Sequence, residues 1–223
     1  MLDKNKTNSV LGEEVHNLLM DAGVETPLFS CEEVSYDERY SVIRNSVFQI
    51  MLALNLDVED DSLAETPDRI TKMYLNEIFW GLDYNNFPKI TTISNKMQYN
   101  TMLLERHIKV ASECEHHFLP FTGEAFVAYI PNEKIIGLSK INRIVEFFCR
   151  RPQVQERLCE QIFHTLCYIL DTDNVAVLIK AEHTCVKLRG VEDTNSDTVT
   201  TKLGGAFSEN LTTRNEFFQS VKL

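Results

Sequence analysis

The apolar residues of this chain change their spacing near Pro88, and that change limits the folds open to it. Before this point they recur every three or four positions, which is the period of an amphipathic helix. After it, short runs rich in β-branched and aromatic residues alternate with two longer helical stretches. Helices followed by strand pairs with helices between them predict an α+β fold rather than repeated βαβ units.

The first part of the chain is predicted to be mainly helical. Two amphipathic helices are expected over Leu11 to Ala22 and Glu38 to Leu56. Ser62-Leu-Ala-Glu65 has the form of a capping box, and Thr66-Pro67 has the form of a helix cap followed by a first-turn proline. The helix after this proline is expected to end at Gly81.

The sequence therefore predicts a helical N-terminal region, residues 1–95, and a mixed α+β domain, residues 96–223. The predicted strands of the second region are His107 to Glu113, Glu124 to Ile130, Asn174 to Lys180 and His183 to Arg189, the last two joined by a tight turn. The predicted helices are Ser139 to Cys149, Pro152 to Leu170 and a short stretch from Thr213 to Val221.

The overall charge is strongly acidic, with 22 Lys and Arg against 33 Asp and Glu and a net charge of −11. Such a chain repels nucleic acid and anionic membranes, so neither is expected as a partner. No apolar run approaches the ~20 residues that span a bilayer, and Met1 to Ser9 lacks the apolar core of a signal peptide. A cytoplasmic protein is expected, and a phosphate-bearing substrate would need a local cluster of basic residues.

The densest chemical segment is Cys114-Glu115-His116-His117. Cys114 and His117 are three residues apart, so one turn of chain brings both to a single ion. Thiolate and imidazole are the ligands that zinc prefers. Two ligands do not make a site, so a third must come from another part of the chain.

Cys185 is the best candidate for that third ligand. It lies in the middle of the predicted strand His183 to Arg189, in which His183, Cys185, Lys187 and Arg189 alternate. Alternate residues of a strand share one face, so this face would offer a thiolate, an imidazole and two cations together.

A set of three protein ligands, Cys114, His117 and Cys185, leaves the fourth zinc position to water, which is typical of catalytic sites. Bound zinc lowers the pKa of its water to ~7 and so supplies hydroxide at neutral pH. His116 and His183 would then be spare imidazoles suited to proton transfer. Two alternatives stay open: a disulfide between the two cysteines, or a closed structural site that uses both histidines.

The remaining cysteines give no functional signal. Cys149, Cys159 and Cys167 fall in apolar helical stretches, where cysteine acts as a small hydrophobic residue. Cys31 lies in a polar loop and is assigned no role.

Two helix starts are candidate binding sites. Ser139, Lys140 and Arg143 lie where backbone N–H groups favour an anion, although an ordinary capped helix would look the same. Glu156 and Gln155 open the next helix, and a carboxylate there accepts two hydrogen bonds from the N1–H and 2-amino group of guanine. The alternative for Glu156 is the usual preference of acidic residues for a helix N-terminus.

These segments together resemble the GTP cyclohydrolase I family, from about Leu11 to Val221 and in the same order along the chain. The matching segments are Thr66 to Met73, Gly81 to Phe87, Cys114 to Phe118, Ala128 to Pro131, Gly137 to Arg143, Arg151 to Arg157 and His183 to Gly190.

The resemblance implies a tunnelling fold (T-fold), in which antiparallel sheets, each with two helices, join across subunits into a barrel. It also implies a toroidal homodecamer with active sites at subunit junctions, where basic residues of neighbouring chains would meet. The implied reaction converts GTP and water to 7,8-dihydroneopterin triphosphate and formate, the first step of tetrahydrofolate and pterin biosynthesis.

The resemblance also implies roles for single residues. Cys114, His117 and Cys185 match zinc ligands, and His116 and His183 match residues that move protons. Glu156 and Gln155 match a guanine-recognition pair. The groups that match the triphosphate and ribose site are Ser139, Lys140, Arg143, Arg189 and Arg69, and Ser139 is also placed to assist the later sugar rearrangement.

Two competing hypotheses remain beside this hydrolase. One is a relative with the same fold and other chemistry, such as a pterin synthase or a nitrile reductase, which would need a different metal set or a catalytic thiol elsewhere. The other is a non-catalytic zinc-stabilised assembly protein, which a closed site using both His116 and His117 would support.

Overall fold

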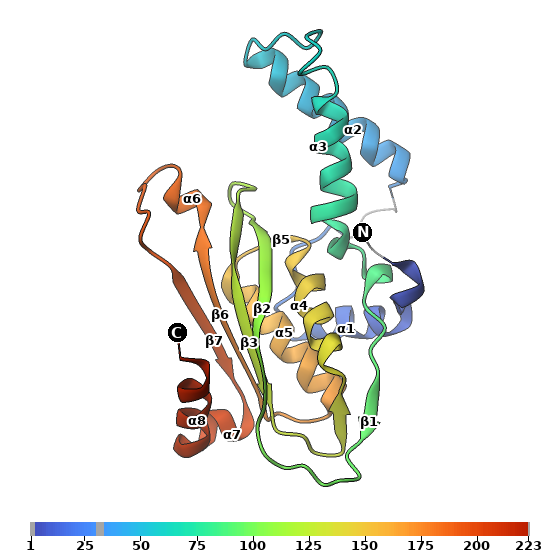
Figure 1. Ribbon diagram of the computed structural model, residues 1–223. Coiled ribbons are helices and arrows are strands. Elements are labelled where there is room, and N and C mark those ends of the chain that lie inside the picture. Colours follow the sequence, from blue (N-terminus) through green and yellow to red (C-terminus); the bar gives the residue numbers. More distant parts are fainter. Residues whose placement is uncertain (1–2, 30–33, 223) are drawn as a thin grey trace. The chain divides into compact units, whose positions relative to one another are not determined.

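The computed structural model describes residues 3–29 and 34–222, so Cys31 lies outside the described residues. The chain divides into two compact units. One contains Pro27–Trp80, and the other contains Asp3–Thr26 and Gly81–Leu223 (Figure 1). None of the described helices is long and apolar enough to cross a membrane.

The smaller unit is built on two helices, α2 (Tyr36–Ala53) and α3 (Thr66–Met73), the latter continuing into a π-helical turn over Tyr74–Ile78. Asp68 of α3 joins them, since it accepts a hydrogen bond of 2.6 Å from the Tyr40 hydroxyl and pairs with Arg44 at 2.9 Å. Both partners come from the first half of α2, so this contact fixes how the two helices pair.

The start of α3 differs in detail from its prediction. Pro67 does lie in the first turn, but the cap position is Glu65 and no side chain caps the helix there. The capping box predicted over Ser62 to Glu65 is wrong because α3 begins only at Thr66, so Ser62 is not at the cap position. Ser62 lies in the preceding turn, where its hydroxyl donates to Asp60 at 2.6 Å.

The larger unit is built on a five-stranded sheet in the order β5-β2-β3-β6-β7, in which every neighbouring pair is antiparallel except β2 with β5. The strands are β2 (Leu103–Cys114), β3 (Pro120–Tyr129), β5 (Pro152–Gln153), β6 (Val175–His183) and β7 (Thr198–Leu203). A separate ribbon pairs β1 (Thr92–Ser94) with β4 (Lys134–Ile136).

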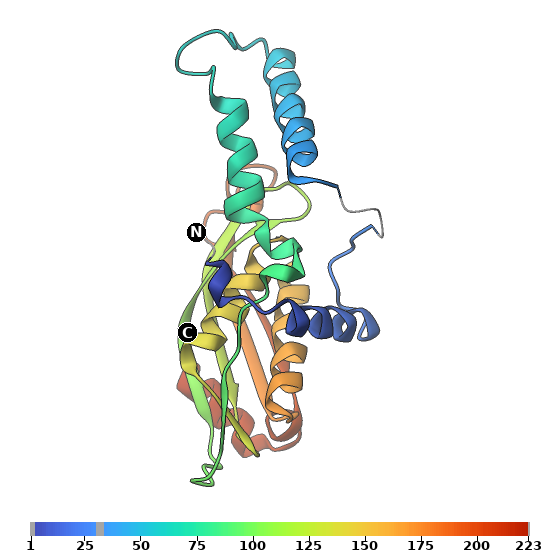
Figure 2. The ribbon, with the colours of Figure 1, turned by 90° about the vertical axis from the view of Figure 1, so that its right-hand side faces the viewer.

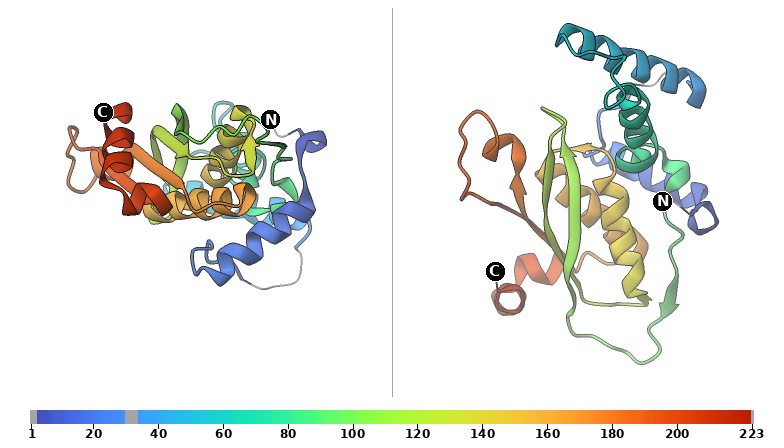
Figure 3. Two further views of the ribbon diagram at one scale, coloured as in Figure 1. Left: turned by 90° about the horizontal axis from the view of Figure 1, so that it is seen from below. Right: turned by 45° about the horizontal axis from the view of Figure 1, so that its top comes forward.

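Both faces of this sheet are covered. The helices α4 (Leu138–Cys149) and α5 (Gln155–Leu170) lie on one side, and α7 (Gly205–Glu209) and α8 (Leu211–Val221) lie on the other (Figures 2 and 3). The α7 and α8 side is closed by a buried cluster of Phe126, Ala128, Ala176, Leu178, Phe207, Phe217 and Val221. Two covered faces explain why β3 and β6 are apolar at consecutive positions. The predicted α+β class, with an antiparallel sheet and two helices, is confirmed.

The predicted strand pair over Asn174 to Lys180 and His183 to Arg189 is wrong. Residues Val175–His183 form one continuous strand, which pairs with β3 as far as the Phe121 and His183 positions. The chain then enters a short helix, α6 (Thr184–Lys187). The alternation read as a strand came from polar residues, whereas the apolar residues between them, Val186 and Leu188, are 36% and 73% exposed. On its other edge β6 pairs with β7. The sequence analysis missed β7 although Thr198 to Leu203 is rich in β-branched residues.

The helix α1 (Ser9–Asp21) belongs to the larger unit and is followed by a loop that a buried arginine holds. The side chain of Arg151 is 0% exposed and pairs with Glu25 at 3.1 Å, and its second terminal nitrogen donates to the Gly81 carbonyl. The aromatic rings that pack on its guanidinium are Tyr84, Phe147 and Phe148. This contact ties three distant segments together behind the β5 end of the sheet.

Candidate active site

Cys114 is the last residue of β2, and the segment after it forms a tight turn. The Cys114 N–H donates to the Leu119 carbonyl, and the Phe118 N–H donates to the Cys114 carbonyl, both at 2.8 Å. Phe118 has a φ of 51°, the left-handed conformation that lets the chain reverse here. The turn therefore displays His116 and His117 at the end of the strand, where both are exposed.

Cys185 reaches the same place from the other side of β3. It lies in α6, directly after the end of β6, where the Thr184 hydroxyl donates to the Pro120 carbonyl at 2.5 Å. The donor atoms of Cys114, His183 and Cys185 all lie within 4.8 Å of one another. Within residues 3–29 and 34–222, this is the one group of three such side chains close enough to hold a metal ion.

The donor set fits zinc, since two thiols and an imidazole are soft and borderline ligands. Both cysteines are free rather than joined in a disulfide. Burial and the neighbouring Cys114 thiol raise the pKa of Cys185. Two thiols this close to each other favour a cation, because an ion between them would relieve the repulsion of their thiolate forms.

The two histidines of the turn do not join that group in this structure. His116 Nδ1 lies 3.7 Å from the Cys114 sulfur. His117 Nε2 lies 2.8 Å from a terminal nitrogen of Arg189. The imidazole that lies near the two sulfurs is therefore that of His183. His117 is on the Cys114 turn, and its role as a zinc ligand stays a prediction.

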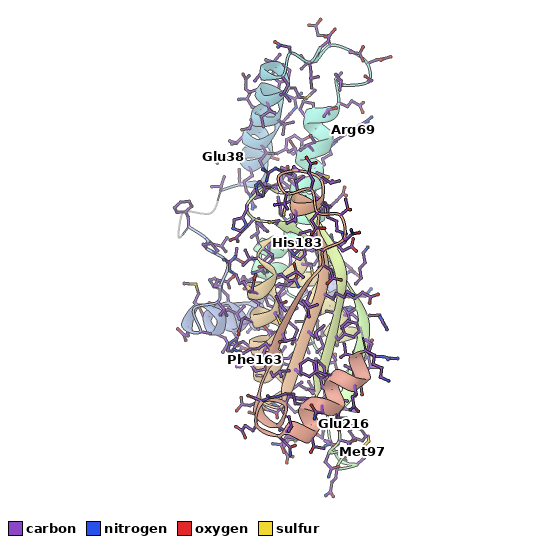
Figure 4. The ribbon with its side chains drawn as sticks, turned by 90° about the vertical axis from the view of Figure 1, so that its left-hand side faces the viewer. Glu38, Arg69, Met97, Phe163, His183 and Glu216 are labelled. Atoms are coloured by element: carbon purple, nitrogen blue, oxygen red, sulfur yellow. The ribbon has the colours of Figure 1, made fainter. Side chains whose placement is uncertain are left out.

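His183 lies at the end of β6 that leads into α6 (Figure 4). Its ring stacks on Phe121, with centroids 4.7 Å apart and an interplanar angle of 13°. Its Nε2 lies 2.9 Å from Oε1 of Gln155. Burial lowers the pKa of His183, which favours the neutral ring, and the nearby Glu156 carboxylate opposes this shift.

Gln155 and Glu156 start α5 beside this group but differ in exposure. Gln155 is 2% exposed and makes hydrogen bonds at both ends of its amide, whereas Glu156 is exposed. The next residue, Arg157, pairs with Glu115 of the turn at 2.5 Å. This ion pair holds the turn against the first turn of α5, a contact that sequence reasoning did not find.

Of the predicted anion-binding residues, Arg189 lies beside His117 of the turn, and the three on α4 lie elsewhere. Ser139, Lys140 and Arg143 are at the start of α4, beside β4, whereas the end of α4 leads directly to β5 and the Cys114 end of β2 (Figure 1). A helix of 12 residues is about 18 Å long. Within one chain, the basic group and the sulfur group therefore lie near opposite ends of α4.

Two further lysines accompany this basic group. Burial lowers the pKa of Lys140, and the positive charges of Arg143, Lys89 and Lys6 add to the effect. Lys6 and Lys89 are brought together by a backbone hydrogen bond of 2.8 Å from the Lys89 N–H to the Lys6 carbonyl. Neither belongs to a recognisable motif, so only the folded chain shows that a chain of net charge −11 has a local cationic cluster.

Arg69 belongs to the smaller unit, on α3. Its guanidinium pairs with Glu65 at 2.8 Å, and both side chains are more than two-thirds exposed, at 72% and 74%. Its predicted role toward a triphosphate stays a prediction.

Comparison with known proteins decides the family. Residues 43–222 match the family model described as GTP cyclohydrolase I. The chain belongs to the GTP cyclohydrolase I family. GTP cyclohydrolase 1 of Erwinia tasmaniensis is 57% identical over 209 residues, which cover 93% of this chain and 95% of that protein. The enzyme of the same name from Yersinia enterocolitica is 54% identical over 94% of this chain and 95% of its own length.

The family predicted from the motifs is thus confirmed, and with it the assignment as an enzyme of the GTP cyclohydrolase I family. Of the three hypotheses raised by the sequence, this favours the hydrolase over a relative with other chemistry and over a non-catalytic zinc protein. A solved dihydroneopterin aldolase from Burkholderia thailendensis, bound to guanine, aligns with 50% of this chain and 97% of that chain at 15% identity and a TM-score of 0.33. A TM-score this low supports no conclusion about this chain.

Proposed function

We propose that this protein converts GTP and water to 7,8-dihydroneopterin triphosphate and formate, the first step of tetrahydrofolate and pterin biosynthesis, with Zn²⁺ as cofactor. The observation that carries the proposal is the meeting of Cys114, Cys185 and His183 within 4.8 Å at one end of the sheet, in a member of the GTP cyclohydrolase I family. A cytoplasmic location, without nucleic acid or membrane as partner, agrees with the acidic composition.

Cys114, Cys185 and His117 would hold the metal. When bound, zinc with one open position supplies hydroxide at neutral pH by lowering the pKa of its water to ~7. His117 is on the same turn as Cys114 and is exposed, so its side chain has room to turn toward the sulfurs. His183 would then remain a neighbouring imidazole, with its Nε2 engaged by Gln155.

His116 and His183 would move protons during ring opening and loss of formate. His183 is suited to accept a proton, because burial favours its neutral form and one ring nitrogen is not bonded to Gln155. His116 is exposed beside Cys114 and can meet a substrate from the solvent side. The two imidazoles, one on the turn after β2 and one at the end of β6, would flank the place where the purine ring would lie.

Glu156 would recognise guanine. Its carboxylate is exposed on the first turn of α5, next to His183, and can accept hydrogen bonds from N1–H and the 2-amino group together. The motif match pairs Gln155 with guanine as well, but the Gln155 amide is buried and its hydrogen bonds go to the protein. We therefore assign the purine edge to Glu156.

Ser139, Lys140 and Arg143, with Arg189 and Arg69, would bind the triphosphate and ribose, and Ser139 would also assist the later sugar rearrangement. The first three are on α4, whose far end leads to β5 and the Cys114 end of β2. This separation along the helix supports a site that a second copy completes. We propose that sheets of neighbouring copies join into a barrel, that the assembly is a homodecamer, and that each active site combines the sulfur end of one copy with the basic end of the next.

GTP turnover tests the reaction. The purified protein is incubated with GTP, and formate and the fluorescent neopterin formed after oxidation are measured before and after zinc removal by a chelator, then after zinc is restored. We expect turnover that the chelator abolishes and zinc restores. A zinc-loaded protein that forms neither formate nor pterin would refute the proposal.

Mixing of variants tests the shared site. Cys114→Ser lacks a sulfur and Lys140→Met lacks a basic residue, so each alone is expected to be inactive. Chains mixed while unfolded and refolded together should regain activity in about one quarter of the sites, because random pairing unites the two intact ends that often. Absence of any recovery in refolded mixed oligomers would place both groups in one chain's own site.

A further inference from the structure

The buried amide of Gln155 has only one possible orientation. Gln155 opens α5 and is 2% exposed. Its Nε2 lies 3.0 Å from the Ile179 carbonyl oxygen, 3.0 Å from the Thr198 carbonyl oxygen and 3.2 Å from the Thr200 hydroxyl. Backbone carbonyls only accept hydrogen bonds, so the amide nitrogen must face them, and a flipped amide would set oxygen against two oxygens.

This orientation determines where His183 carries its proton. The other end of the amide, Oε1, lies 2.9 Å from Nε2 of His183. Since Oε1 can only accept, Nε2 must donate and therefore carries the hydrogen. In the neutral ring the lone pair is then on Nδ1, which is the nitrogen left to ligate or to exchange a proton.

The ring is also held in its plane. Phe121 stacks on one face of His183 at 4.7 Å between centroids, while Gln155 holds its edge. The two backbone carbonyls belong to neighbouring strands, Ile179 to β6 and Thr198 to β7. The sheet thus fixes the amide, and the amide fixes the imidazole.

We propose that Gln155 is a positioning residue, which holds His183 in a single neutral tautomer with hydrogen on Nε2 and the lone pair on Nδ1. Its effect on catalysis rests on the proposed function, whereas the tautomer itself does not. The competing role, contact with guanine, would require the amide to leave three hydrogen-bonding partners inside the protein.

Nitrogen NMR tests the tautomer directly. Zinc-loaded protein carrying ¹⁵N-labelled histidine is studied by magic-angle spinning at about pH 8, above the ordinary histidine pKa of about 6.5. The His183 signals are identified by their absence in His183→Asn. We expect a protonated Nε2 and an unprotonated Nδ1 in the unmodified protein. Hydrogen on Nδ1 would overturn the proposal without any variant of Gln155.

Two methionine variants then separate positioning from packing. Gln155→Met removes the bond to His183, whereas Gln153→Met alters another buried glutamine, whose Nε2 donates instead to the Phe148 carbonyl and to Gln161. We expect mixed tautomers in Gln155→Met and the native tautomer in Gln153→Met. An unchanged tautomer in Gln155→Met would contradict the proposal.

Kinetics distinguish the two roles of Gln155. Loss of a group that orients a catalytic imidazole is expected to lower kcat about 10- to 100-fold in Gln155→Met, with little change in the KM for GTP. A raised KM with unchanged kcat would instead show that the amide binds guanine. If the unmodified protein has the expected tautomer and no GTP turnover, the proposed function fails and the tautomer assignment stands.

Discussion

Two groups of polar side chains lie at one end of the sheet in the larger unit, and they serve opposite purposes. Around Arg151, charges and aromatic rings are sealed in the interior, where Glu25 and Tyr84 accept hydrogen bonds from one of its terminal nitrogens and the Gly81 carbonyl accepts from the other. Around Cys114, Cys185 and His183, the side chains face each other at the ends of strands, and His183 and Cys185 are only partly buried. The first group binds the protein to itself, whereas the second leaves donors available for an ion and a substrate.

One short stretch of chain contributes to both the closed cluster around Arg151 and the open cluster around Cys114, Cys185 and His183. Arg151 stands four residues before Gln155, and β5 between them pairs with the Cys114 end of β2. The closed cluster therefore holds the segment that pairs with the strand end carrying Cys114. Groups in the closed cluster are therefore expected to control stability, and groups in the open cluster are expected to control metal content and turnover.

The largest expected effect is the loss of metal and turnover in Cys185→Ser. A serine hydroxyl is a poor substitute for a thiolate toward zinc, so zinc content and GTP turnover should both fall to background. Cys167→Ser is the matched control, because Cys167 is another free and partly buried cysteine outside the sulfur group. Zinc content is measured by atomic emission, and a zinc-loaded, active Cys185→Ser would contradict the account.

Substitutions of His117 and His183 should differ in their effect on zinc content. His117→Ala is expected to lose zinc, whereas His183→Ala is expected to keep zinc and lose turnover by about 10²- to 10⁴-fold, as for loss of a general acid or base. The reverse outcome, zinc lost with His183 and kept with His117, would make the three side chains within 4.8 Å the complete ligand set.

Substitutions in the closed cluster around Arg151 should lower the stability of the protein. Arg151→Met removes the guanidinium that pairs with the buried Glu25 carboxylate and is expected to lower the free energy of unfolding by about 3–5 kcal/mol. Arg150→Met is the matched control, because Arg150 pairs with Glu146 at 3.5 Å near the surface and should contribute about 0–1 kcal/mol. Denaturant unfolding measures the free energy of unfolding of both variants. Equal losses would contradict the expected difference between the buried and the exposed ion pair.

The smallest expected effect lies in the other unit, at Asp68. The hydrogen bond from Tyr40, with help from Arg44, lowers the pKa of Asp68 below its ordinary 3.8. A depressed pKa in the folded state means stability that is present above pH 3.8 and is lost as the pH falls through the folded pKa. Asp68→Asn should therefore lower the unfolding midpoint slightly at neutral pH and not at all in strong acid. A difference independent of pH would exclude this contribution.

Most helices of the fold could be predicted from the sequence, whereas α6 and β7 could not, for two different reasons. Helix positions such as α4 and α5 follow from local apolar periodicity, so they were found within a few residues. The α6 segment was misread because the alternation of His183, Cys185 and Arg189 does not follow burial: the apolar residues between them, Val186 and Leu188, are exposed. β7 was missed because its pairing with β6 is a long-range property.

The candidate site shows the same limit. Cys114 and Cys185 could be named together because their residue types already indicate zinc. The bond between Gln155 and His183 could not be predicted, because it depends on carbonyls that β6 and β7 contribute only once they are paired. Lys6 and Lys89 escaped notice for a similar reason, since they approach Lys140 only in the folded chain.

In the proposed site, two sulfurs and one imidazole hold zinc and leave a fourth position open. X-ray absorption at the zinc edge of the purified protein measures these ligands. We expect about two sulfur atoms at ~2.3 Å and one imidazole nitrogen with one further light atom at ~2.0–2.1 Å, at about one zinc per chain. A zinc shell without sulfur, or one with two imidazoles and no solvent ligand, would contradict it.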